Sequence, residues 1–124
     1  MKKGAALGDA KTKSGAGGFA AWFHGILTRE QSESLLSKMP QGGFLVRVSE
    51  SRFGYSLSFK HNDRIKHFMI DQTPDGRYLV VGNDRTFPGL NELVYFHSTH
   101  PLTEDGDLLT HPCPAQAENL AEFM

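Results

Sequence analysis

One arginine in the middle of an apolar run constrains the fold more than any other feature of the chain. The run Gly-Phe-Leu-Val-Arg-Val at residues 43–48 has strand propensity and an almost continuous apolar pattern, which predicts a β-strand covered on both faces. Arginine keeps its charge in proteins, and an unpaired buried charge is very costly. The strand therefore predicts an anionic partner for Arg47, either a carboxylate of the protein or an anion that arrives with a ligand.

The residues after this strand favour a ligand. Ser49, Glu50 and Ser51 offer two hydroxyls and a turn of backbone N–H groups, a composition that can surround phosphate oxygens. A guanidinium below and a hydroxyl-rich turn above together predict a phosphate site. Two plainer interpretations stay open at this point. Arg47 could form a structural ion pair with Glu50 or Asp71, and the two serines could be ordinary turn residues.

The composition is that of an ordinary globular domain. The chain has 124 residues, of which 39% are apolar and 22% charged, enough for one compact domain with its own core. The net charge of −1 argues against a nucleic-acid partner, because no basic excess is present to neutralise a polyphosphate. One cysteine and no membrane-length apolar stretch predict a reducing, cytoplasmic location without membrane insertion.

The sequence gives little support for a catalytic or metal-binding site. His97 and His100 are three residues apart, but Pro101 follows and should end any helix before His100. No cysteine or carboxylate completes a set, so we expect no metal. Cys113 has no evident nucleophile context, and no nucleotide-binding loop is present. We expect neither a cofactor nor catalysis.

The pattern along the chain predicts an α+β fold, with a central antiparallel β-sheet flanked by two α-helices. Thr28 and Gln31 form a capping box that should start the first helix, and Pro88 suits the first turn of the second. We expect a flexible leader, partly of non-native origin, at residues 1–20, the domain at 21–113 and a tail at 114–124. The expected elements are helices at 28–39 and 88–97, strands at 43–48, 54–60, 65–70 and 78–81, and a loop at 98–113.

These motifs, in this order, resemble the Src homology 2 (SH2) domain, a phosphotyrosine-binding module, over about residues 21–113. The opening Trp-Phe-His-Gly and the closing Leu-Leu-Thr-His-Pro-Cys also resemble small SH2-containing adaptors of haematopoietic cells. The segments that carry the resemblance are Trp22–Gly25, Thr28–Leu36, Phe44–Ser49, Tyr55–Ser58, His67–Phe68, Leu90–Val94 and Leu109–Cys113.

The resemblance implies two binding pockets. In the family, an essential arginine at the position of Arg47 grips two phosphate oxygens, and an arginine at the position of Arg29 lies against the phosphotyrosine. The implied phosphotyrosine-binding residues are Arg47, Arg29, Ser49, Glu50, Ser51, Ser56, His67 and Met69. The implied peptide-specificity pocket comprises Phe68, Ile70, Thr86 and Leu102, between loops near residues 83–87 and 101–107.

One position departs from the family pattern. Many members carry Lys or Arg two residues after the histidine of the third strand, where this chain has Met69. The site loses one cation and gains an apolar contact for the tyrosine ring. We therefore expect phosphate recognition to depend more heavily on Arg47 and Arg29. His67 can serve as pocket wall or as an ordinary packed histidine.

The sequence thus predicts a non-catalytic, monomeric adaptor module whose partners are tyrosine-phosphorylated proteins or peptides. Two rival hypotheses belong to other classes. A small phosphatase could use Arg47 for substrate phosphate, although it would need a nucleophile beside that arginine. A scaffold could act through its helix faces with an unused pocket, and exchange of the C-terminal segment between chains is a further alternative to the monomer.

Overall fold

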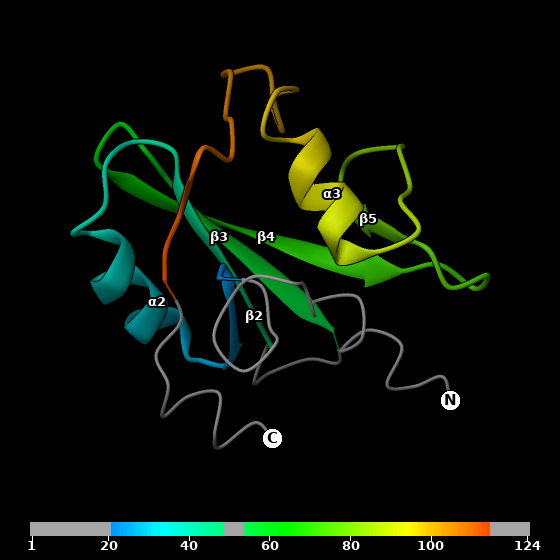
Figure 1. Cartoon of the computed structure of the whole chain (residues 1–124), viewed down its shortest axis with the longest axis horizontal. Coiled ribbons are helices and arrows are strands. Elements are labelled where there is room, and N and C mark those ends of the chain that lie inside the picture. The colour runs from blue at the N-terminus through cyan, green and yellow to red at the C-terminus, as the bar shows by residue number, and fades with distance from the viewer. Residues whose placement is uncertain (1–20, 49–53, 115–124) are drawn as a thin grey trace.

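The computed structural model describes residues 21–48 and 54–114, and within them two helices lie on opposite sides of a six-stranded sheet (Figure 1). The predicted α+β class is confirmed. The strands are β1 (Phe23–Ile26), β2 (Gly43–Val48), β3 (Tyr55–His61), β4 (Arg64–Gln72), β5 (Tyr78–Val80) and β6 (His111–Pro112), and the helices are α2 (Arg29–Leu36) and α3 (Leu90–Phe96).

The sheet is mostly antiparallel, as predicted, with two parallel pairings in addition. Neighbouring strands follow the order β1-β2-β3-β4-β5, and β6 also pairs with β2. The pairs from β2 to β5 are antiparallel, whereas β1 and β6 each run parallel to β2. Neither β1 nor β6 was predicted, and the expected loop at 98–113 in fact ends in β6. Both are short, so only pairing with the distant strand β2 defines them.

Helix α2 begins where the capping box predicts. The Thr28 hydroxyl accepts a hydrogen bond from Gln31 N at 3.0 Å, and the Gln31 side chain accepts one from Thr28 N at 2.9 Å. The helix ends at Leu36 with Ser37 as its C-cap, three residues before the predicted end. A turn closed by Met39 N donating to Leu36 O leads on towards β2.

Helix α3 begins later than predicted. Gly89 is its N-cap, and Pro88 lies outside the helix. Two backbone hydrogen bonds between Tyr78 and Phe87, of 2.8 and 2.7 Å, keep the chain extended up to Phe87. Helical geometry can therefore start only after Pro88. His97 is the C-cap of α3 rather than a member of the helix.

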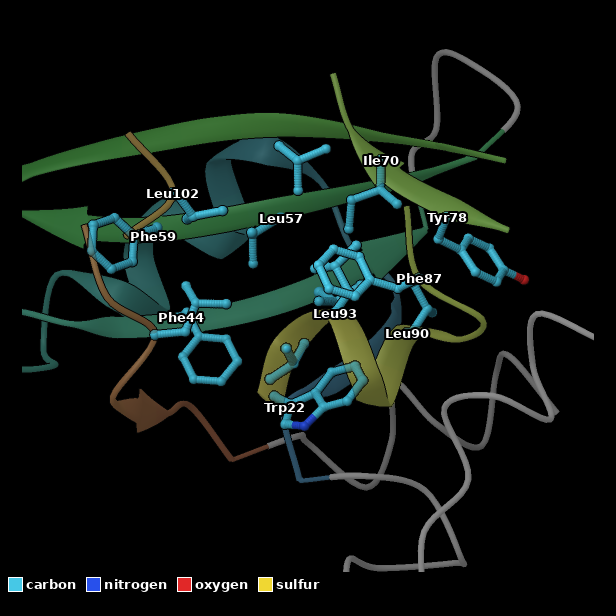
Figure 2. Packing of buried hydrophobic residues seen from close by; sticks show 14 of the residues in the cluster. Trp22, Phe44, Leu57, Phe59, Ile70, Tyr78, Phe87, Leu90, Leu93 and Leu102 are labelled. Atoms are coloured by element: carbon cyan, nitrogen blue, oxygen red, sulfur yellow. The ribbon is translucent and has the colours of Figure 1, made fainter. Parts of the chain in front are cut away.

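The sheet separates a large hydrophobic core on the α3 side from a small one on the α2 side. Because the small core covers only part of its sheet face, room is left there for polar side chains. Side chains from β2, β3 and β4 meet Leu90 and Leu93 of α3 in the large core (Figure 2). On the α2 side the buried apolar cluster is confined to Leu27, Leu36, Leu45 and Cys113. Most other side chains on that sheet face are polar, while Ile65 packs against the small cluster and Met69 is exposed. No helix among residues 21–48 and 54–114 is long and apolar enough to cross a membrane.

Candidate functional site

Arg47 lies buried in the middle of β2, and both the neighbouring strand β3 and the chain before α2 hold its side chain. Its side chain is on the α2 side because Val46 and Val48 belong to the α3-side core. Nε donates to the Ser58 hydroxyl at 3.3 Å, and Nη1 donates to the Leu27 carbonyl at 3.2 Å. The residue is only 6% exposed. The guanidinium is thus fixed from the chain before α2 and from the neighbouring strand β3.

Strands β3 and β4 extend this polar face, as the alternation of their side chains predicts. In the register of the sheet, Arg47 pairs with Ser56, and Ser56 pairs with Met69. Ser58 pairs with His67 in the same way, and its hydroxyl lies 2.9 Å from His67 Nδ1. Ser56 and Ser58 are buried, whereas Met69 is 45% exposed. The face therefore deepens from an apolar rim at Met69 to the buried guanidinium.

Helix α2 contributes two charged side chains to the border of this face. Glu33 Oε2 accepts a hydrogen bond from His67 Nε2 at 2.8 Å and one from Arg29 Nε at 3.4 Å. The hydrogen bond from His67 is the main cause that lowers the pKa of Glu33. Burial is the main cause that lowers the pKa of His67, and the nearby charges of Arg29 and Arg47 act in the same direction. The hydrogen bond to Glu33 acts in the opposite direction, and the net lowering of the pKa favours the neutral ring of His67.

The structure brings five of the predicted phosphate-site residues onto this face or its border, namely Arg47, Arg29, Ser56, His67 and Met69. Ser49, Glu50 and Ser51 lie outside the described residues. Sequence reasoning missed Glu33 and Ser58. Glu33 lies one helical turn after Arg29, and Ser58 is two residues after Ser56 on the same strand, so both shared a face with a predicted residue.

A second pocket lies on the other side of β4. It has a volume of about 440 Å³, with apolar walls from β4, β5 and the loop after α3 and polar residues at its edge. Two of the predicted specificity residues, Phe68 and Leu102, line it. The lining residues are Phe68, Val80, Val81, Gly82, Asn83, Leu102, Thr103, Glu104 and Asp105.

Ile70 and Thr86 lie apart from this lining. Ile70 is 1% exposed and belongs to the large core, so it can only support the pocket from beneath. Thr86 accepts hydrogen bonds from Arg77 at its hydroxyl and its carbonyl. Thr86 lines a different depression, beside Phe96 of α3. The resemblance groups Ile70 with Phe68 in one pocket, whereas in the structure Ile70 is part of the large core and Phe68 only packs against it.

A buried carboxylate holds the loop that forms one wall of the second pocket. The Asp107 side chain is fully buried, and its Oδ2 accepts hydrogen bonds from Lys66 Nζ at 3.0 Å and Thr103 Oγ1 at 2.7 Å. His61 Nδ1 lies 2.7 Å from Oδ1, although this contact lacks hydrogen-bond geometry. The hydrogen bond to Asp107 is the main cause that raises the pKa of Lys66. The loop of residues 101–107 is thus tied to β3 and β4.

Cys113 is a structural residue. It is buried in the small cluster under α2, and burial raises the pKa of its thiol. Its carbonyl accepts a hydrogen bond of 2.8 Å from the buried His24 Nε2, which ties β1 to the segment after β6. Among residues 21–48 and 54–114, no group of three His, Cys, Asp or Glu side chains could hold a metal ion.

Comparison with known proteins identifies the family. The model of the SH2 domain family matches residues 22–97. The chain belongs to the SH2 domain family. This SH2 domain is 46% identical over 92 residues to a hematopoietic SH2 domain-containing protein homolog of Danio rerio, covering 74% of the chain and 25% of that protein. It is 42% identical over 96 residues to the hematopoietic SH2 domain-containing protein of Homo sapiens, covering 77% of the chain and 27% of that protein. The chain thus spans about a quarter of the length of these relatives.

Solved structures agree with this assignment. The SH2 domain of a CRK/CRKL homolog from Monosiga brevicollis superimposes with a TM-score of 0.71 at 31% identity, over 83% of this chain and 95% of that one. The VAV1 SH2 domain, solved in complex with a tyrosine-phosphorylated peptide from SLP76, gives a TM-score of 0.67 at 29% identity, over 76% and 70% of the two chains.

Proposed function

We propose that this SH2 domain is a non-catalytic module that binds tyrosine-phosphorylated peptides and links its host protein to tyrosine-kinase signalling. The observation that carries the proposal is Arg47, a buried arginine on a polar sheet face whose side chain donates to the Ser58 hydroxyl and the Leu27 carbonyl. A phosphotyrosine brings about −1.5 to −2 charges and three acceptor oxygens, for which a guanidinium is the matching bidentate donor. The VAV1 relative in complex with a tyrosine-phosphorylated peptide supports the same function.

The proposed phosphotyrosine site combines a buried anchor with a mixed rim. Arg47 binds the phosphate from below, and Arg29, which is exposed on α2, approaches it from the helix. Ser49, Glu50 and Ser51 are proposed to contribute the turn above the phosphate. Ser56 and His67 form the wall, and Met69, exposed at the rim, packs against the tyrosine ring. A phosphate held at mid-strand depth suits the long phenol arm of tyrosine better than the short arm of serine.

The second pocket is proposed to accept an apolar residue that follows the phosphotyrosine. Phe68 stands between the two pockets on β4, since it lines the second pocket while its neighbours His67 and Met69 face the first. Leu102 contributes the opposite wall. Ile70 supports Phe68 from within the core, and Thr86 is proposed to act only by holding the chain before α3.

The phosphatase alternative is disfavoured by the surroundings of the one cysteine. Cys113 is buried, its thiol pKa is raised, and its backbone N–H donates to Phe44 O, so a thiolate nucleophile is unfavourable there. We propose an adaptor role, a cytoplasmic location and a monomeric state for the domain, with no nucleic-acid partner and no membrane insertion.

A calorimetric titration with three peptides of one sequence tests this function. The peptides carry phosphotyrosine, tyrosine or phosphoserine at the same position. We expect micromolar or tighter binding of the phosphotyrosine peptide alone, with no release of inorganic phosphate on prolonged incubation. Equal binding of all three peptides would support the scaffold alternative, and phosphate release would support an enzyme.

A further inference from the structure

A chain of hydrogen bonds leads from the carboxylate of Glu33 to the guanidinium of Arg47. Glu33 Oε2 lies 2.8 Å from His67 Nε2, and His67 Nδ1 lies 2.9 Å from the Ser58 hydroxyl. The same hydroxyl lies 3.3 Å from Arg47 Nε. The links join α2, β4, β3 and β2, although Glu33 and His67 are 34 residues apart in the sequence.

The donor and the acceptor of each hydrogen bond in this series follow from the two groups at its ends, Glu33 and Arg47. Glu33 is ionised and can only accept, so His67 must carry its proton on Nε2. Burial lowers the pKa of His67 and so favours the neutral ring, in which Nδ1 accepts from the Ser58 hydroxyl. The Ser58 oxygen, having given its one proton to His67, is then an acceptor for Arg47 Nε–H. Each group has the one role that its neighbour requires.

The other neutral tautomer of His67 would satisfy fewer of these hydrogen bonds. If His67 carried its proton on Nδ1, Ser58 could no longer donate to it. The hydroxyl proton of Ser58 would have to point to the Ser32 hydroxyl, which lies 3.5 Å away, at the limit of a hydrogen bond. Nε2 would also face the Glu33 carboxylate without a proton between them. The carboxylate therefore selects one tautomer of His67 and one orientation of the Ser58 hydroxyl.

We propose that Glu33 is a positioning residue for phosphotyrosine capture: through His67 and Ser58 it fixes the orientation in which Arg47 receives the phosphate. This inference rests on the proposed function, since it concerns the same arginine. Glu33 also pairs with Arg29, but that contact is 3.4 Å long and joins side chains that are 66% and 42% exposed. His67 is only 11% exposed in its side chain, so the contact with His67 is the more effective of the two.

Two substitutions separate the hydrogen bond of Glu33 from its charge. Glu33→Gln keeps an oxygen acceptor for His67 Nε2 and removes the charge, whereas Glu33→Ala removes both. Glu30→Gln, which removes an exposed charge from the first turn of the same helix, is the matched control. In titrations with a phosphotyrosine peptide we expect Glu33→Ala to weaken binding about fivefold. Glu33→Gln and Glu30→Gln should remain within about twofold of the unchanged protein.

Nuclear magnetic resonance of the ligand-free protein provides a second readout, which a general loss of stability would not imitate. The ring ¹⁵N shifts of His67 report its tautomer, and the Nε–H resonance of Arg47 reports its contact with Ser58. Both should move in Glu33→Ala and stay close to their original values in Glu33→Gln. Unchanged shifts in Glu33→Ala would overturn the proposal.

A double-mutant cycle with Ser58→Ala tests the route. Because both substitutions act through the same chain, Glu33→Ala should have little further effect on peptide affinity once Ser58 is alanine. Additive effects, or equal losses in Glu33→Ala and Glu33→Gln, would overturn positioning through Ser58. If the unchanged protein bound no phosphopeptide, the proposed function would fail, while the ligand-free resonances would still decide whether Glu33 orients Arg47.

Discussion

Asp107 offers a quantitative test of how the second pocket is held, because one buried carboxylate ties the loop of residues 101–107 to the sheet. The perturbation is Asp107→Ala, which removes the acceptor for Lys66 Nζ at 3.0 Å and Thr103 Oγ1 at 2.7 Å. Hydrogen bonds to charged groups typically contribute about 1.5–3 kcal/mol each. Lys66 is 28% exposed in its side chain and would be rehydrated, so its share is discounted. We expect a loss of about 2 kcal/mol in the free energy of unfolding.

The assays are urea unfolding and thermal unfolding, both followed by the fluorescence of Trp22, which is buried in the folded domain. A loss of that size should lower the melting temperature by about 8–16 °C. Asp105→Ala is the matched control, because Asp105 pairs with the same Lys66 at 3.2 Å but is 68% exposed. Its replacement should cost less than about 0.5 kcal/mol. If Asp107→Ala cost no more than Asp105→Ala, the reasoning from burial would be refuted.

Two further predictions concern pH and specificity. Burial is the main cause that lowers the pKa of His24, His67 and His97, so the unfolded chain binds their protons at higher pH than the folded one. The free energy of unfolding should therefore fall as the pH drops from about 7 to about 5, by at most about 1.4 kcal/mol per pH unit for each histidine. Urea unfolding at both pH values measures this change. An unchanged free energy of unfolding would contradict the lowered pKa values of the three histidines. A degenerate phosphopeptide library should show enrichment of apolar residues shortly after the phosphotyrosine, and Phe68→Ala should reduce that enrichment. Enrichment of acidic residues alone would argue against the apolar pocket.

The central part of the sheet could be predicted because its evidence is local. The strand predicted at residues 54–60 corresponds to β3, and the apolar run around Arg47 predicted a covered strand. The capping box at Thr28 predicted the start of α2. Period-two and capping signals act over a few residues, so the sequence carries them directly.

The structural features that the sequence did not predict depend on contacts between segments that are distant in the sequence. Strands β1 and β6 exist because they pair in parallel with β2, and the late start of α3 follows from the bridge between Tyr78 and Phe87. Glu33 had no predicted role in the site, because its contact with His67 joins α2 to β4 across 34 residues of sequence. Ile70 lies apart from the pocket lining for a similar reason, because its burial comes from packing in the large core.

The most direct test of the central claim is a titration of one phosphotyrosine peptide against the unchanged protein and Arg47→Ala. Arg64→Ala is the matched control, because Arg64 is an exposed arginine on β4. Thermal unfolding of each variant establishes that it is folded. We expect Arg47→Ala to weaken binding at least about a hundredfold, by analogy with the loss of a buried charged partner, whereas Arg64→Ala should bind as the unchanged protein does. A folded Arg47→Ala protein with undiminished affinity would contradict the account.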